Sequence, residues 1–174
     1  MKRTLALVVF LAISGCMISG QAQESGVELK HFPLDSKEKV RAITGVSFDA
    51  QTSADGRGSL RIDAKEPMVV PLFEVSDVSI ENATLIYRAS LQSQNLDGRA
   101  YLEMWVRLPG KGEFFSRGLD RPVTGSMSWM TVATPFFLQA GQKPDLIRLN
   151  LVVEGKGRVW IDDVRLLRAP LPNR

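Results

Sequence analysis

The sequence predicts an all-β protein: an antiparallel two-sheet β-sandwich, preceded by a signal peptide and a short flexible tether. Three observations lead to this prediction. Apolar residues recur with a period of two in segments bounded by Gly, Pro, Asn and Asp. No segment after residue 30 sustains helical amphipathicity over three turns. No connection offers the helix of roughly 10–15 residues that joins parallel strands in α/β proteins.

The first fifteen residues are typical of a secretory signal. Lys2 and Arg3 give a positive start, and residues 5–13 form an unbroken apolar run. A helix of that length rises about 14 Å, roughly half of the hydrocarbon core of a bilayer, so it is too short for a permanent span. The alternative is a buried N-terminal helix, which the flanking charges disfavour.

The only cysteine follows this run directly, in the order Ile13-Ser14-Gly15-Cys16. The order resembles the lipobox of bacterial lipoproteins. The resemblance implies cleavage before Cys16, diacylglycerol attachment to its thiol and acylation of the new amino terminus, which together anchor the chain in a membrane of the cell envelope. Because residue 17 is Met and not Asp, it also implies the outer membrane if the host has two membranes. The alternative is a free secreted protein with an unmodified cysteine.

The domain organisation follows from composition. Residues 1–15 form the signal peptide, residues 16–29 a small and polar tether, residues 30–168 one β-sandwich domain, and residues 169–174 a tail. Lys2 and Arg3 supply two of the 22 basic side chains, so the rest of the chain is close to neutral against 19 acidic ones, and nucleic acid is not an expected partner. One Cys and one His exclude a disulfide framework and a multi-histidine metal site.

Eight segments carry the strand pattern, and residues 36–42 allow one short helical turn. The first two predicted strands, 44–49 and 58–63, flank a loop rich in Ser, Asp and Gly, and the third, 68–74, is an apolar run. Strict alternation then predicts the remaining strands: 84–91, 100–108, 128–137, 146–153 and 158–167.

Alternation also assigns side chains to faces. Leu102, Met104, Val106 and Leu108 share one side of their strand and are expected in the core, where a one-residue slip would expose all of them. The other side of this strand and of two others carries polar and aromatic residues. The candidate ligand-binding row is Tyr101, Glu103, Trp105 and Arg107, beside Arg88, Arg148 and Asn150.

This row suits a sugar ligand, provided that the three strands are neighbours. Tyr101 and Trp105 supply rings on which the C–H face of a sugar stacks, while Arg, Glu and Asn side chains bind hydroxyls. The alternative is that the N-terminal segment or a loop covers both rings. Trp129 and Trp160 are interpreted as core or sandwich-edge residues, and Phe115 as part of a loop at the rim of the candidate face.

Four segments, in order along the chain, resemble galactose-binding-like jelly rolls and carbohydrate-binding modules of the family 4 and 9 type. They are DGRGSLRI (55–62), GRAYLEMWVRL (98–108), SMSWMTVATPFFL (126–138) and GKGRVWIDDVRLL (155–167). The resemblance implies the jelly-roll fold and carbohydrate binding. It also implies a structural calcium held by Asp163, with Asp49 as a second ligand. The alternative for Asp163 is that its carboxylate caps nearby backbone amides.

The sequence favours a binding module over an enzyme. The sole imidazole, His31, lies just after the tether without a nucleophile nearby in the pattern, and no Gly-rich phosphate loop is present. The predicted function is therefore a membrane-anchored, non-catalytic module for carbohydrate or another envelope polymer. The alternative is a structural or assembly lipoprotein of the envelope that binds a protein partner.

Overall fold

The computed structural model describes residues 26–36 and 44–172, and the regular structure of these residues is entirely β. Among them, no helix is long and apolar enough to cross a membrane. The strands, in chain order, are β1 (Val27–Phe32), β2 (Val46–Asp49), β3 (Ser59–Ala64), β4 (Met68–Ser76), β5 (Ala83–Leu108), β6 (Gly112–Arg117), β7 (Val123–Leu138) and β8 (Leu146–Ala169).

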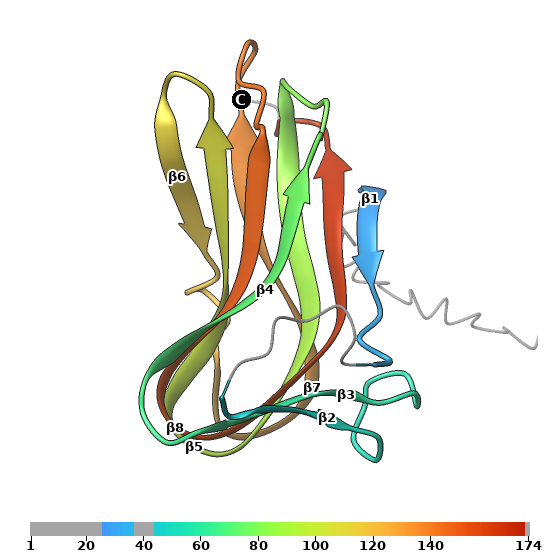
Figure 1. The fold of residues 1–174 in the computed structure, drawn as a ribbon, viewed down its shortest axis with the longest axis vertical. Helices are drawn as coiled ribbons and strands as arrows, with labels where there is room; N and C mark the ends of the chain where they lie inside the picture. Colours follow the sequence, from blue (N-terminus) through green and yellow to red (C-terminus); the bar gives the residue numbers. More distant parts are fainter. Residues whose placement is uncertain (1–25, 37–43, 173–174) are drawn as a thin grey trace, which may run out of the picture.

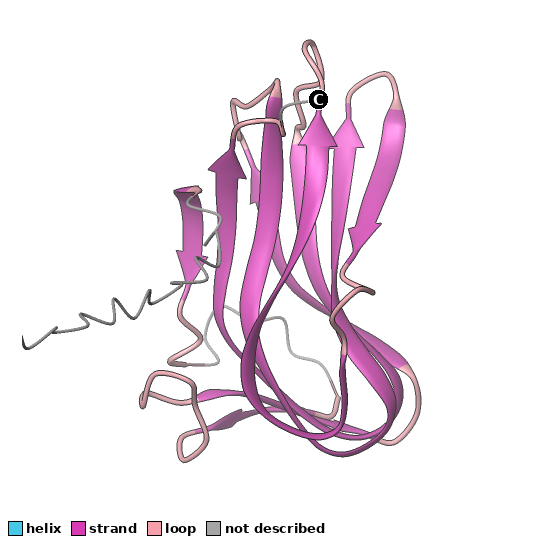
Figure 2. Cartoon of the chain, turned by 180° about the vertical axis from the view of Figure 1, so that it is seen from behind, coloured by secondary structure: helices cyan, strands magenta, loops and turns pink. Residues whose placement is uncertain are grey.

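The strands form one antiparallel hydrogen-bonded sheet that folds over into two layers (Figures 1 and 2). The long strands β5 and β8 pair with each other and run through both layers. Layer A consists of β4, β8 residues 146–153, β5 residues 99–108 and β6, in that order. Layer B is centred on β8 residues 157–169 and β5 residues 83–94. β7 lies beside β5, and β1 and β3 lie beside β8. β2 lies beside β3 at the margin.

Paired glycines let β5 and β8 bend from one layer into the other. Gly98 lies opposite Gly155, and their φ angles are 121° and 150°. A Cβ atom on Gly98 would lie 1.9 Å from the Glu154 carbonyl oxygen. Only glycine fits such a close approach and adopts such a φ without strain. The two strands therefore stay paired around the bend.

The core lies between the inner faces of the two layers, as the alternation predicts. Leu102, Met104 and Val106 are at most 1% exposed, and the inner side chains of β8 in layer A are equally buried. Tyr87 of layer B lies in the same core. The predicted register and the predicted β-sandwich are thus confirmed.

A β-bulge changes the alternation in β8. Arg88 pairs with Arg165, whereas Ser90 pairs with Asp162, so β8 has one residue more than β5 over this stretch. Asp163 is the extra residue, with a φ of 49°. By strict alternation from Val159 and Ile161, Asp163 would point into the core, but the bulge resets the faces of β8 and leaves Asp163 partly exposed.

Several predicted boundaries differ from the structure. The predicted strands 84–91 and 100–108 are parts of β5, and 146–153 and 158–167 are parts of β8. β1 and β6 were not expected. β1 begins at Val27, inside the predicted tether, and pairs with β8. The signal peptide, Cys16 and most of the predicted helical turn at 36–42 lie outside the described residues.

Candidate functional site

The outer face of layer A brings together six of the seven predicted ligand-binding residues. Trp105 of β5 lies directly opposite Arg148 of β8 on one side and Phe115 of β6 on the other. Glu103 lies two residues away, opposite Asn150 of β8. In an antiparallel sheet, directly opposite side chains have Cβ atoms about 5 Å apart, so these residues form one surface.

Glu103 is the organising carboxylate of this face and is only 4% exposed. Its Oε1 accepts hydrogen bonds from the Trp105 indole N–H at 2.7 Å and from the Asn150 side-chain amide at 3.2 Å. Its Oε2 accepts one from the Arg117 guanidinium at 2.7 Å. Burial alone would raise the pKa of Glu103, but these three donors outweigh it, and the pKa lies below its usual value. Glu103 therefore fixes its neighbours rather than offering free oxygens to a ligand.

Trp105 and Phe115 form an aromatic platform on this face. Their ring centroids are 5.2 Å apart with an interplanar angle of 47°. The Arg117 guanidinium lies over the Phe115 ring at 4.7 Å from its centroid. Phe115 is 52% exposed, and Trp105 is half-buried. The platform therefore combines accessible ring surface with an orientation that the Glu103 hydrogen bond holds.

Ion pairs border the platform at the end of layer A away from the bend. Arg148 pairs with Glu113 of β6, and Arg107 donates to Asp145 Oδ1 at 2.8 Å. A guanidinium carries five N–H donors, so each arginine keeps donors for a ligand after pairing with one carboxylate.

The other end of the face is closed by Tyr101, which is only 2% exposed. Its hydroxyl donates to Glu154 Oε1 at 2.8 Å, and Arg99 pairs with the other oxygen of Glu154. The pKa of Glu154 is lowered, first by the hydrogen bond from Arg99 and then by that from Tyr101. Tyr101 thus presents little ring surface to a ligand in this structure.

The alternative for this face was that the N-terminal segment or a loop covers the rings of Tyr101 and Trp105. The structure agrees with it only in part. β1 lies beside β8 in layer B, so this N-terminal strand does not lie on the outer face of layer A. Neighbouring side chains bury Tyr101, whereas Trp105 keeps part of its surface exposed.

Arg88 does not belong to this surface. It pairs with Ala133 of β7 and Arg165 of β8, which places it in layer B. The prediction that it lies beside Trp105 is wrong because residues 84–91 and 100–108 are consecutive parts of one strand that crosses between layers. They are not neighbouring strands of one sheet.

Sequence reasoning missed two residues of the face, Glu113 of β6 and Arg99 near the bend. It placed Glu154 on the outer side and Arg117 in a rim loop, but gave neither a role. It also interpreted Phe115 as a loop residue, whereas Phe115 lies in β6. The turn signal Pro109-Gly110-Lys111 after a clear strand could have indicated a hairpin, and a hairpin places residues 113, 115 and 117 on the face of Trp105.

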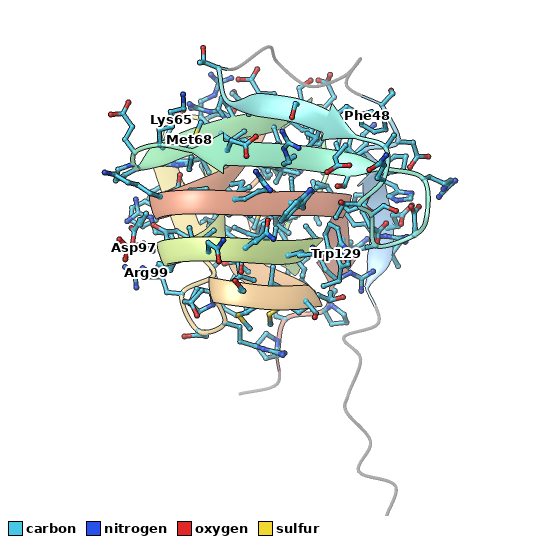
Figure 3. The ribbon with its side chains drawn as sticks, turned by 90° about the horizontal axis from the view of Figure 1, so that it is seen from below. Phe48, Lys65, Met68, Asp97, Arg99 and Trp129 are labelled. Atoms are coloured by element: carbon cyan, nitrogen blue, oxygen red, sulfur yellow. The ribbon has the colours of Figure 1, made fainter. Side chains whose placement is uncertain are left out.

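The outer face of layer B carries the other two tryptophans, of which Figure 3 labels Trp129. Trp160 is 5% exposed and lies on the side of β8 opposite Ile161, so it is not in the core between the layers. Its indole N–H donates to Asp49 Oδ2 at 2.9 Å. Trp129 of β7 is half-buried on the side opposite Met130, which packs against the core.

The two predicted calcium ligands, Asp163 and Asp49, both accept hydrogen bonds from other groups of the protein. Asp163 accepts from His31 at 2.7 Å and from Arg165 at 2.8 Å. Asp49 accepts from Trp160 and from the backbone amides of residues 51 and 52. Among the described residues, no three His, Cys, Asp or Glu side chains are grouped as metal ligands. Calcium takes six to eight oxygen ligands, and the described residues group no further carboxylates around Asp163 and Asp49, so the calcium site stays a prediction.

Backbone capping, the alternative for Asp163, is instead carried out by Asp162. It is fully buried and accepts from the backbone amides of Ala54 and Asp163, each at 2.8 Å. Burial raises the pKa of Asp162, and the two amide bonds oppose this shift only in part. Asp162 thereby ties the loop between β2 and β3 to β8.

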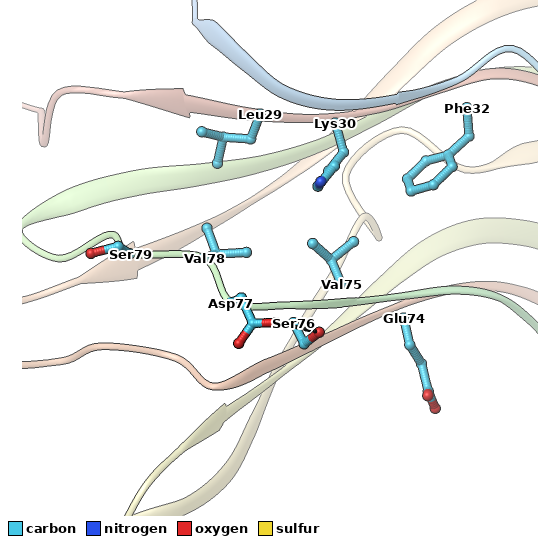
Figure 4. A pocket seen from close by; sticks show the side chains of 9 residues that line it. All are labelled: Leu29, Lys30, Phe32, Glu74, Val75, Ser76, Asp77, Val78 and Ser79. Atoms are coloured by element: carbon cyan, nitrogen blue, oxygen red, sulfur yellow. Dashed lines mark hydrogen bonds between the residues drawn. The ribbon is translucent and has the colours of Figure 1, made fainter.

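A cleft of about 580 Å³ opens between the two layers along their other edge, where β1 faces β4 and the loop after it (Figure 4). Leu29 and Phe32 come from β1, and Val75 and Val78 face them. Phe32 also stacks on Phe73 of β4 with a centroid distance of 3.8 Å. No predicted site residue lines this cleft, so it is separate from the face of Trp105.

The sequence matches no protein-family model and no curated protein. Solved structures do match. The CBM22-1 xylan-binding domain of Xyn10C from Paenibacillus barcinonensis aligns with a TM-score of 0.59 and 13% identity, covering 87% of this chain and 100% of that domain. The chain has the jelly-roll fold of carbohydrate-binding modules.

Two further solved structures support this assignment of the fold. The CBM22-1–GH10 modules of xylanase 10B from Clostridium thermocellum, in complex with xylohexaose, align with a TM-score of 0.62 and 9% identity, over 83% of this chain and 29% of that one. A family 16 carbohydrate-binding module aligns with a TM-score of 0.53 and 10% identity, over 76% of this chain and 89% of that one. Identities this low show a shared fold, and the site must be argued from its own residues.

Proposed function

We propose that this chain is a non-catalytic module that binds a glycan across the outer face of layer A and is held at a membrane of the cell envelope through Cys16. The observation that carries the binding proposal is the Trp105–Phe115 platform, set among hydrogen-bonding side chains on an open sheet face. Its fold is that of modules whose described ligands include xylan.

The chemistry of the platform matches that of a sugar ring. The C–H face of a pyranose stacks on an aromatic ring, and its hydroxyls need donors and acceptors at the ring edge. Trp105 and Phe115 supply the ring surface, and Arg107 and Arg148 flank it with spare N–H donors. An extended polysaccharide lying across the strands would contact both kinds of group.

The acidic side chains of this face favour binding over glycoside hydrolysis. A general acid for that reaction needs a carboxyl pKa raised toward neutrality. Glu103 and Glu154 instead have lowered pKa values, and Arg117 and Arg99 hold them ionised. The carboxylates of this face act as anchors for arginines.

Retention on insoluble xylan and on a panel of other polysaccharides tests the proposal. Trp105→Ala should reduce retention of the folded protein at least about tenfold, since stacking and area burial by one indole contribute more than 1.4 kcal/mol. Trp129→Ala is the matched control, because Trp129 lies on the outer face of layer B. Absence of retention on every polysaccharide, or an equal loss in both variants, would overturn the proposal.

The alternative function, an assembly lipoprotein that binds a protein partner, makes a different prediction for the same variants. A partner protein would be captured by crosslinking in intact cells and lost in Trp105→Ala, while polysaccharide retention would be absent in the unmodified chain. The two results together therefore separate the two functions.

A further inference from the structure

β6 is a regular, exposed edge of the sheet. It is the last strand of layer A in the hydrogen-bonded order, and Figures 1 and 2 both place it at the margin of the molecule. Its six residues pair with β5 without a register shift. Phe114 is 43% exposed and Phe115 52%. A regular, exposed edge strand with apolar side chains presents unpaired backbone groups to any other strand.

The other edges of the described sheet carry features that block pairing. β4 contains Pro71 and a register shift directly after it. β1 has a register shift between Glu28 and Lys30. β7 contains Pro135 and several shifts, and β2 has only four residues. Proline, bulges and short length protect many natural edge strands, and β6 has none of these three. Charged residues are a further protection, and β6 carries two, Glu113 and Arg117, which form ion pairs with Arg148 and Glu103 on the outer face of layer A.

We propose that β6 pairs antiparallel, edge to edge, with β6 of a second copy of this chain. The sequence of β6 is complementary to itself in one register, the one centred on Phe115. That register places Glu113 opposite Arg117 at both ends and Phe115 opposite Phe115 at the two-fold axis. Moving the two-fold axis by two residues, onto residue 113 or residue 117, would place Glu113 or Arg117 opposite itself, which is unfavourable.

The side-chain directions agree with this register. Glu113, Phe115 and Arg117 pair across β5 with Arg107, Trp105 and Glu103, so all three lie on the outer face of layer A. In the dimer, layer A of one copy continues into layer A of the other, and the two Trp105–Phe115 platforms adjoin. The pairing itself needs no glycan and does not rest on the proposed function.

Disulfide trapping tests the register. The full chain carries Cys16→Ser, so that an introduced cysteine is its only thiol. Phe115→Cys should then give a disulfide-linked dimer under mild oxidation, because residues opposite each other at the axis bring their Cβ atoms within about 5.5 Å. Val69→Cys is the control: it is 52% exposed and lies on β4, at the opposite edge of layer A. Equal crosslinking of both variants would overturn the register.

Sedimentation equilibrium of the Cys16→Ser chain tests the dimer itself. We expect a reversible monomer–dimer equilibrium that Phe115→Lys weakens by about tenfold or more, because two lysines then meet at the axis. Val69→Lys should leave it unchanged. Thermal melting of each variant confirms folding. A monomer at every concentration tested, or a dimer that Phe115→Lys does not weaken, would show that β6 is a free edge.

Discussion

At the scale of single residues, Tyr87 has a polar group in an unfavourable place. It is fully buried in the core, and its hydroxyl has no hydrogen-bond partner. Burial raises the pKa of this hydroxyl. An unsatisfied buried hydroxyl costs about 1–3 kcal/mol, so Tyr87→Phe should raise the free energy of unfolding by about 1 kcal/mol. Urea denaturation measures this change, and a clear loss of stability would contradict it.

Glu103 gives the face a defined pH dependence. Its pKa is lower in the folded chain than its ordinary value of 4.5. The ionised form therefore contributes stability above about pH 4.5, and this contribution is lost as the pH falls through the lower folded-state pKa. Glu103→Gln should cost about 1–3 kcal/mol at pH 7 and less at acidic pH.

Denaturation of the unmodified chain and of Glu103→Gln at a series of pH values measures this difference. Glu113→Gln is the control, because Glu113 is exposed and its ion pair with Arg148 should contribute little. A difference that stays constant from neutral to acidic pH would refute the role given to the Glu103 carboxylate.

At the scale of elements, the bend of β5 and β8 depends on glycines that face each other. Gly98→Ala would place a Cβ atom 1.9 Å from the Glu154 carbonyl oxygen at a φ of 121°. We expect a loss of about 3 kcal/mol or more, seen as a lower melting temperature. Gly110→Ala is the control: its φ is 72°, but its Cβ would meet nothing within 4 Å. Its cost should be about 1 kcal/mol, and equal costs would argue against the bend as the constraint.

The same glycines explain where prediction of the elements failed. Alternation of side chains fixes the faces of residues 100–108 and 146–153, because burial on one side repeats every second residue. Asn95, Gly98, Gly155 and Gly157 have the residue types of turns, and a positive φ serves a turn and a bend equally well. Four strands were therefore predicted where two long ones run.

Prediction missed β1 and β6 for a different reason. Most side chains of β1 and β6 are exposed, so their sequences lack the apolar alternation that burial imposes. Asp163 shows a third limit, since one inserted residue in β8 reverses every face after it. The candidate face was predictable where it lies on β5 and β8. The β6 contribution depended on a hairpin that alternation alone does not reveal.

At the scale of the whole molecule, thermal melting tests whether the fold needs calcium. A cation that binds only the folded chain raises its stability, and a chelator removes that increment. Because Arg165 pairs with Asp163 and the described residues group no further carboxylates with Asp163 and Asp49, we expect the same melting temperature with and without a calcium chelator. A midpoint that falls on chelation and returns with added calcium would reinstate the predicted site.

Attachment to a membrane would determine where this binding face works in the cell. About ten residues separate Cys16 from β1, and a random coil of that length would reach roughly 15–20 Å, enough to lift the sandwich off the lipid headgroups. Lipidation of Cys16, as proposed, should place the unmodified chain in the membrane fraction of a bacterial host that processes lipoproteins.

Cys16→Ser removes the acceptor atom, so that variant should move to the soluble envelope fraction with an unchanged melting temperature. Met17→Asp keeps the cysteine and should stay membrane-bound; in a host with two membranes it should shift to the inner one. Two or more acyl chains hold a protein firmly, whereas a single chain binds reversibly, so membrane retention through a high-salt wash separates a lipid anchor from surface adsorption. An unmodified chain that fractionates like Cys16→Ser would place the proposed glycan-binding face on a freely diffusing protein.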